Sequence, residues 1–289
     1  MIRIPTIEKQ FFKVVPVCNT GKCRVSICGM RTRIKGFEVS PKLNTYTYSN
    51  TSPYSDKLLN SLSRTRSTIR DLSIANFCSN DYFFTQTFNP ERVNSFDFDT
   101  VDSIFKEKIH YLKSVYPGLK YIYVFEKHKS GRVHIHGLIS GIPSSEFVFS
   151  GHRDKKLNKI FNLPRWSDSL GFNTFTKIND SEKTSSYISK YITKDLASMP
   201  TNKLHKNLYR CSLGLIRAIR GETRLEIDVD YKTDFCSLSY FDVELDSNFV
   251  STLLSSLPHD NGVLSSFFWL INSDKSLNID DGYLRCQFL

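Results

Sequence analysis

The chain has 289 residues, of which 40% are hydrophobic and 24% charged, a composition typical of a globular protein with a substantial core. No uncharged apolar run is long enough to cross a bilayer, and the first residues lack the continuous apolar segment of a secretory signal. We therefore expect a soluble protein of the cell interior.

The formal net charge of +10 is unevenly distributed along the chain. Residues 221–289 carry four Lys/Arg and twelve Asp/Glu, whereas residues 1–220 carry 35 and 17. A basic body favours a polyanionic partner such as nucleic acid, although many basic proteins bind none. The acidic segment is expected to form a separate subdomain that does not lie on the same nucleic acid.

Seven cysteines are present, an odd number, and no two of them form a CxxC pair. Free thiols in a reducing compartment are the simplest interpretation. The even spacing of Cys18, Cys23 and Cys28 leaves a zinc site open as an alternative, although the sequence supplies no evident fourth ligand.

The predicted elements follow one another in a regular order. Short strands and loops are expected over residues 1–50, and apolar residues at helical intervals predict a helix over 55–77. A strand over 81–88 is followed by a helix over 97–116 with Asp99 as its N-cap. Strands are then predicted over 120–127, 132–140 and 171–178, followed by a helix over 181–199 that begins near Ser181 and a strand over 207–215.

This order, from the strand at 81–88 onward, is β-α-β-β-β-α-β with a central hairpin, which indicates an α+β fold with an antiparallel sheet and packed helices. We expect an N-terminal β-rich, basic extension over 1–63, a main domain over 64–220 and the acidic subdomain over 221–289. No internal repeat is evident.

The hairpin 120–140 places three potential metal ligands on one face. His134 and His136 are two residues apart on a strand and therefore project from the same side. If the loop is centred on Ser130, Glu126 lies directly opposite His134 and shares its face. A carboxylate and two imidazoles suit a divalent cation such as Mg²⁺ or Mn²⁺. A register slip of one residue would remove Glu126 from this face, and the alternative is a surface glutamate beside hydrogen-bonded histidines.

The helix over 181–199 carries "SSYISKYITKD". Tyr187, Lys190, Tyr191 and Lys194 fall within one sector of this helix, beside an apolar stripe that can dock on the sheet. A tyrosine hydroxyl can attack a phosphodiester covalently, and a lysine can neutralise the charge that develops. The alternative is a basic amphipathic helix whose tyrosines only pack.

Three motifs in this order resemble those of the HUH endonucleases, in particular the rolling-circle replication initiators of small phages and plasmids. They are "FFTQTF" at 83–88, "HIH" at 134–136 and "YISKY" at 187–191, and the resemblance spans residues 64–215. It implies a five-stranded antiparallel sheet of the RNA-recognition-motif type and a metal held by the histidines and a third ligand. It also implies that a tyrosine nicks single-stranded DNA at an origin, which leaves a free 3′-OH and a 5′-phosphotyrosine.

By motif position, Tyr187 matches the leading nucleophile, Lys190 the catalytic lysine and Tyr191 the second tyrosine of two-tyrosine members. Gln86 departs from the commoner hydrophobic residue of the first motif. No GxxxxGK[ST] phosphate loop is present, so unwinding would require a host helicase, with a host polymerase extending the 3′-OH in the host cytoplasm. The resemblance does not explain the acidic segment.

Two other functions remain open. A metal-dependent hydrolase using Glu126, His134 and His136 would act without a covalent intermediate. A non-catalytic module could bind single-stranded nucleic acid by stacking bases on aromatic strands such as "YIYVF".

Overall fold

The computed structural model describes residues 6–33, 56–194, 209–223, 231–232, 236–244 and 248–255. The chain divides into two compact units. The terminal unit comprises Met1–Leu59 and Arg217–Asp281, and the central unit comprises Asn60–Ile216 and Gly282–Leu289. In the described part of the chain, no helix combines the length and apolar character needed to span a membrane.

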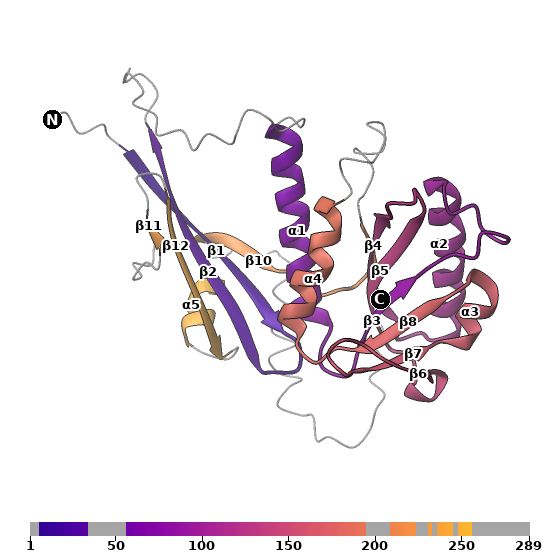
Figure 1. The fold of residues 1–289 in the computed structure, drawn as a ribbon. Helices are drawn as coiled ribbons and strands as arrows, with labels where there is room; N and C mark the ends of the chain where they lie inside the picture. Colours follow the sequence, from indigo (N-terminus) through magenta and orange to yellow (C-terminus); the bar gives the residue numbers. More distant parts are fainter. Residues whose placement is uncertain are drawn as a thin grey trace. The chain divides into compact units, whose positions relative to one another are not determined.

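The terminal unit contains a five-stranded antiparallel sheet built from both ends of the chain (Figure 1). Its strand order is β10-β1-β2-β12-β11, and the bounds are β1 Thr6–Val17, β2 Lys22–Arg33, β10 Ile219–Thr223, β11 Tyr231–Lys232 and β12 Cys236–Glu244. Helix α5, Asn248–Ser255, follows β12. The N-terminal strands, expected to be short, form one long hairpin, and their partners come from residues 217–244.

One ion pair links the basic and acidic segments of the sequence within this sheet. Arg24 and Asp242 are direct neighbours on β2 and β12. The Arg24 guanidinium donates from Nε to Asp242 Oδ1 at 3.0 Å and from its terminal nitrogen to Oδ2 at 3.1 Å. This fork geometry is the favourable arrangement for an arginine–carboxylate pair. Asp242 of the acidic segment therefore pairs with the N-terminal hairpin.

The cysteines considered for zinc lie in the same hairpin. Cys23 and Cys28 are five residues apart on β2, so their side chains leave opposite faces of the strand. Cys23 is buried, whereas Cys18 and Cys28 are partly exposed. Among the described residues, these thiols form no group that could hold a metal ion.

The central unit contains a seven-stranded antiparallel sheet, which confirms the predicted α+β class. The strand order is β6-β7-β8-β3-β5-β4-β9, and the bounds are β3 Tyr82–Gln86, β4 Lys120–Lys127, β5 Val133–Ser140, β6 Val148–Arg153, β7 Lys159–Asn162, β8 Asn173–Lys177 and β9 Tyr209–Cys211. The sheet is wider than the five strands expected. The hairpin β6–β7, which extends one edge, is too charged and irregular to give a clear strand pattern.

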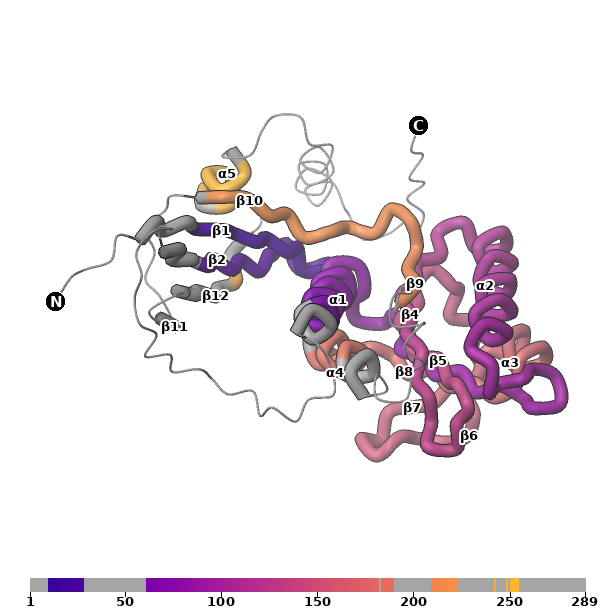
Figure 2. Tube along the Cα trace, turned by 90° about the horizontal axis from the view of Figure 1, so that it is seen from above, coloured from indigo at the N-terminus to yellow at the C-terminus, as the bar shows by residue number. Residues whose placement is uncertain are grey.

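Helices cover both faces of this sheet (Figures 1 and 2). They are α1 Asp56–Asn76, α2 Phe98–Val115, α3 Pro164–Leu170 and α4 Ser181–Lys194, with a short 3₁₀ turn at Ser144–Glu146. Helices α2 and α3 cover one face, while α4 lies on the other with the greater part of α1 beside it. The face under α2 and α3 holds an aromatic core in which Phe84, Phe105, Trp166 and Phe175 pack against one another.

Two helix starts differ from the prediction. The N-cap of α2 is Asp97 rather than Asp99, because the Asp97 carboxylate accepts hydrogen bonds from the backbone of Asp99 and Thr100. Helix α4 begins after Asp180, whose carboxylate accepts from Lys183 N at 3.0 Å, rather than after Ser181. In both helices, a carboxylate is the N-cap acceptor.

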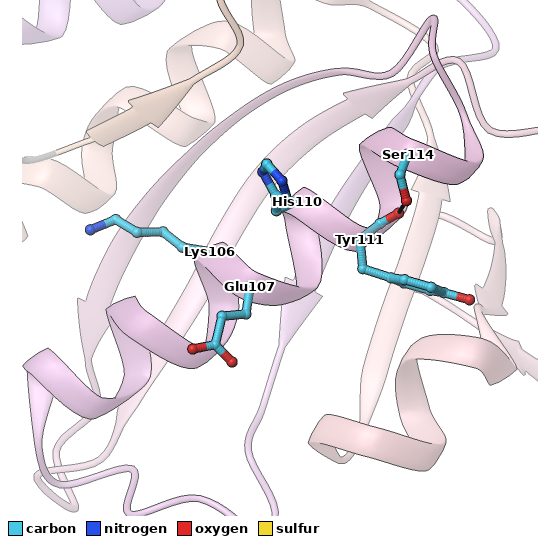
Figure 3. Close-up of a pocket in the computed structure, with 5 residues that line it drawn as sticks. All are labelled: Lys106, Glu107, His110, Tyr111 and Ser114. Atoms are coloured by element: carbon cyan, nitrogen blue, oxygen red, sulfur yellow. Dashed lines mark hydrogen bonds between the residues drawn. The ribbon is translucent and has the colours of Figure 1, made fainter.

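Helix α2 is fixed to the sheet by a buried carboxylate. Asp102 is 7% exposed and accepts from Arg210 of β9 at 2.8 Å and from Lys106 at 2.7 Å. The outer side of α2 carries an open hollow (Figure 3), lined by Lys106, Glu107, His110, Tyr111 and Ser114. All five residues come from the solvent side of one helix, so this hollow lies on the far side of α2 from the sheet.

Candidate active site

The β4–β5 hairpin has the register predicted from its loop. Glu126 is the direct partner of His134, and Val124 is the partner of His136. The chain reverses at residues 128–131, where Gly131 adopts a left-handed φ of 85° and donates to the carbonyl of His128. Glu126, His134 and His136 consequently project from the face of the sheet that α4 covers.

His136 is held at both ring nitrogens. Its Nε2 lies 2.6 Å from Glu126 Oε2, and its Nδ1 lies 3.0 Å from the hydroxyl of Thr85 on β3. An ionised carboxylate only accepts, so Nε2–H donates to Glu126 and the Thr85 hydroxyl donates to Nδ1. Both His136 and Glu126 are more than nine-tenths buried. The orientation of this imidazole is therefore fixed.

His134 is more loosely held. The hydroxyl of Thr87 lies 3.5 Å from its Nδ1, and the ring of His128 stacks on it at 5.2 Å between centroids. Burial lowers the pKa of His134, and the neighbouring His128 and His136 lower it further. A lowered pKa favours the neutral imidazole, the form that has a lone pair for a ligand.

Thr85 and Thr87 were missed as site residues by the sequence reasoning. They are two residues apart and therefore share a face, and Thr85 pairs directly with His136 across β3 and β5. The signal was present in the threonines of "FFTQTF", but its meaning depended on knowing that β3 is the neighbour of β5. Gln86 points to the opposite face, where it is fully buried, and its Nε2 donates to the carbonyl of Thr87 at 2.7 Å.

The donor set has the chemistry of a divalent metal site. Metal-binding histidines commonly fix one ring nitrogen by a hydrogen bond and present the other to the ion, and the two threonines engage the Nδ1 atoms in this way. In the described part of the chain, however, no three such side chains surround a common point closely enough to hold a metal ion. The direct contact between His136 and Glu126 occupies Nε2, so it must open for both groups to bind one ion.

Helix α4 brings Tyr187 to the same face. The helix contacts β4 and β5, and Ser185, Ile188 and Ser189 on its inner side are buried. Tyr187 is 48% exposed, and its ring meets Phe83 edge-on at 5.4 Å between centroids. Phe83 in turn stacks against His136 at 6.1 Å. A phenol that is accessible to solvent therefore lies one aromatic ring away from the histidines.

The remaining predicted site residues lie in the same helix. Lys190 and Tyr191 belong to α4, but their side chains are outside the described residues. The predicted continuation of the helix over 195–199 is also outside them. Their roles stay predictions.

Comparison with known proteins identifies the segment that contains the site. Residues 81–196 match the model of a family of replication-associated proteins, the ORF2 type, which covers less than half of the chain. Neither curated proteins nor solved structures give a match. The matched segment includes Glu126, His134, His136 and Tyr187.

Proposed function

Because residues 81–196 match the replication-associated protein family of the ORF2 type, we propose that this protein nicks and rejoins single-stranded DNA at an origin to initiate rolling-circle replication. The observation that carries the proposal is the shared face of the sheet. Two histidines oriented by threonines and an exposed tyrosine from α4 all lie on it. This combination supports covalent phosphodiester chemistry better than simple strand binding, which requires neither.

In the proposed reaction, the Tyr187 hydroxyl loses its proton and its oxygen bonds to the scissile phosphorus. The bond from phosphorus to the 3′ oxygen breaks, and that oxygen takes up a proton. One phosphodiester is replaced by another, so attack by the 3′-OH on the phosphotyrosine rejoins the strand without an external energy source. The partial exposure of Tyr187 leaves room for the DNA strand.

The other residues have supporting roles in this proposal. Glu126, His134 and His136 would hold a divalent cation, Mg²⁺ or Mn²⁺, which polarises the phosphate and stabilises its developing charge when bound. Lys190, one turn after Tyr187 on α4, is assigned to neutralise charge on the phosphate or the leaving oxygen. Tyr191 is assigned as a second nucleophile for successive strand transfers. A host helicase and polymerase would unwind and extend the DNA.

Labelled oligonucleotides that tile the parent replicon, incubated with Mn²⁺ and resolved on a denaturing gel, test the proposal. We expect a protein-linked label with the wild type, loss of the label in Tyr187→Phe and retention in Tyr191→Phe. Loss only in the double variant would instead make the two hydroxyls interchangeable. Cleavage that survives in the double variant without an adduct would replace the proposal by a metal-dependent hydrolase.

A binding measurement separates catalysis from affinity. His136→Ala should abolish nicking and leave most salt-sensitive DNA binding, because backbone affinity is shared among many cations. Equal loss of nicking and binding would mean that the histidines are structural. Metal-independent binding with no cleavage by the wild type would favour a non-catalytic module.

A further inference from the structure

The hairpin β6–β7 extends the edge of the central sheet, and its exposure is unusual (Figure 1). None of the side chains of β6 is buried, so this strand adds nothing to the core. Three large apolar residues are nevertheless exposed here: Val148 at 54%, Phe149 at 44% and Leu157 at 72%. An edge strand protected only against aggregation would carry charge without such apolar surface.

The hairpin is also strongly basic. Residues 148–162 contain Arg153, Lys155, Lys156 and Lys159 against one acidic residue, Asp154. No ion pair involves these three lysines in the part of the chain that the structure describes. The Lys159 ammonium lies 5.7 Å from the centre of the Phe149 ring, so a cation and an aromatic ring form one surface. Phosphates are the complementary partner for such a surface.

The single carboxylate of the hairpin is used to fix its tip. Asp154 accepts from the backbone of Lys156 at 2.8 Å and of Asn158 at 2.9 Å, and from the Asn158 side chain at 2.9 Å. Arg153 donates to the carbonyl of Leu157 at 2.8 Å. These bonds hold the tip in one shape and leave the ammonium groups of Lys155 and Lys156 directed to solvent.

Leu157 is the least expected residue of the tip. Its φ of 65° is left-handed, a conformation that glycine or asparagine adopts at lower cost than leucine. Because its side chain is largely exposed, packing within the protein does not compensate for this cost. An apolar side chain kept in this position between cations suits contact with the sugars and base edges of a nucleic acid.

The tip is tied to the helix that carries the proposed nucleophile. Asn179 Nδ2 donates to Asn158 Oδ1 at 2.9 Å, and the next residue, Asp180, is the N-cap of α4. A partner bound at the tip is thereby positioned relative to Tyr187, seven residues further along.

From these observations we infer that the β6–β7 hairpin binds duplex DNA that flanks the nicked strand, with Lys155 and Lys156 on phosphates and Leu157 in a groove. A two-stranded ribbon fits a groove of duplex DNA. The inference rests on the proposed function, because it gives that site a second element that selects a single strand adjoining a duplex.

The test compares two DNA probes, a single strand and the same strand attached to a duplex stem, in a salt series. Two phosphate contacts change the slope of log affinity against log salt by about 1.8. The double variant K155Q/K156Q should therefore bind the stem-bearing probe about tenfold to sixtyfold more weakly at about 0.1 M salt. Its affinity for the single strand should be unchanged. The control K113Q/K120Q removes two exposed lysines elsewhere on the same unit and should bind both probes as the wild type does.

A second variant tests the apolar part. Leu157→Gly should weaken binding of the stem-bearing probe without changing the salt slope or lowering the unfolding temperature. Equal loss on both probes, equal loss in the control, or wild-type binding by K155Q/K156Q would overturn the inference. Wild-type binding by Leu157→Gly would overturn the groove contact. None of these readouts requires nicking, so absence of a tyrosine adduct would refute the proposed function separately.

Discussion

Replacement of Thr85 by valine removes one hydroxyl and keeps the shape of the side chain. In the wild type this hydroxyl lies 3.0 Å from His136 Nδ1 and fixes the imidazole from the side opposite Glu126. Valine cannot form this bond, so the buried Nδ1 loses its partner and the ring gains freedom to turn. We expect Thr85→Val to weaken metal-dependent nicking while the fold is retained.

The size of the effect follows from the burial of His136. A buried polar atom without its partner costs about 1–3 kcal/mol. If this cost falls on the metal-bound state, the affinity for the ion drops by a factor of about 5–150, since about 1.4 kcal/mol is tenfold. Removal of partners of metal-binding histidines typically costs about 10–100-fold in affinity or activity, which is the same range.

The assay is the initial rate of adduct formation over a series of Mn²⁺ concentrations. Thr85→Val should shift the half-saturating Mn²⁺ concentration upward within that range. Thr87→Val should shift it less, because the Thr87 hydroxyl is 3.5 Å from His134 Nδ1, at the limit of a hydrogen bond. Thr174→Val is the matched control, since Thr174 is the neighbour of Thr85 on β8.

Three results would refute this reasoning. The first is an unchanged Mn²⁺ dependence in Thr85→Val, and the second is an equal shift in Thr174→Val. The third is a lower unfolding temperature in Thr85→Val that accounts for the whole loss, which would make the hydroxyl structural.

Further expectations concern stability and the aromatic link. Burial by itself would raise the pKa of Asp102, but its hydrogen bonds, the strongest from Arg210, outweigh burial and lower the pKa. This contribution is present above about pH 4 and is lost as pH falls through the lowered pKa, so Asp102→Asn should cost about 1.5–3 kcal/mol at neutral pH and show less acid dependence in urea unfolding. Gly141→Ala should cost at least about 2 kcal/mol, because φ is 86° and a Cβ would overlap the carbonyl oxygen of Gly118, whereas Gly118→Ala, with open space, should cost far less in the same titration. Phe83→Leu should slow adduct formation more than it weakens DNA binding, and equal losses would contradict a positioning role for the ring.

The hairpin that carries Glu126 and the histidines could be predicted because its register depends only on local sequence. A short loop centred on Ser130 determines which residues face each other, and alternation determines which share a face. The same reasoning could not reach Thr85, whose relation to His136 depends on which strands become neighbours in the sheet. Pairing between distant strands leaves no periodic signal in the sequence.

The terminal unit was beyond local reasoning for the same cause. Strand β1 pairs with β10 more than 200 residues later in the chain, as at Gln10 and Thr223. The charge contrast between residues 1–220 and 221–289 indicated two separate segments, while Arg24 and Asp242 form an ion pair across one sheet. Opposite charge along the sequence was here a sign of attraction within a fold.

The same sheet has a consequence for the order in which the protein forms on the ribosome. Strands β1 and β2 emerge first, but their outer neighbours β10 and β12 follow only after the whole central unit has been made. At about 5–20 residues per second, the hairpin waits roughly 10–40 s with both of its edges unpaired. Those edges are open to pairing with other chains during that time. A ribosome that stalls before β12 would therefore release a chain with a finished central unit and an adhesive first hairpin.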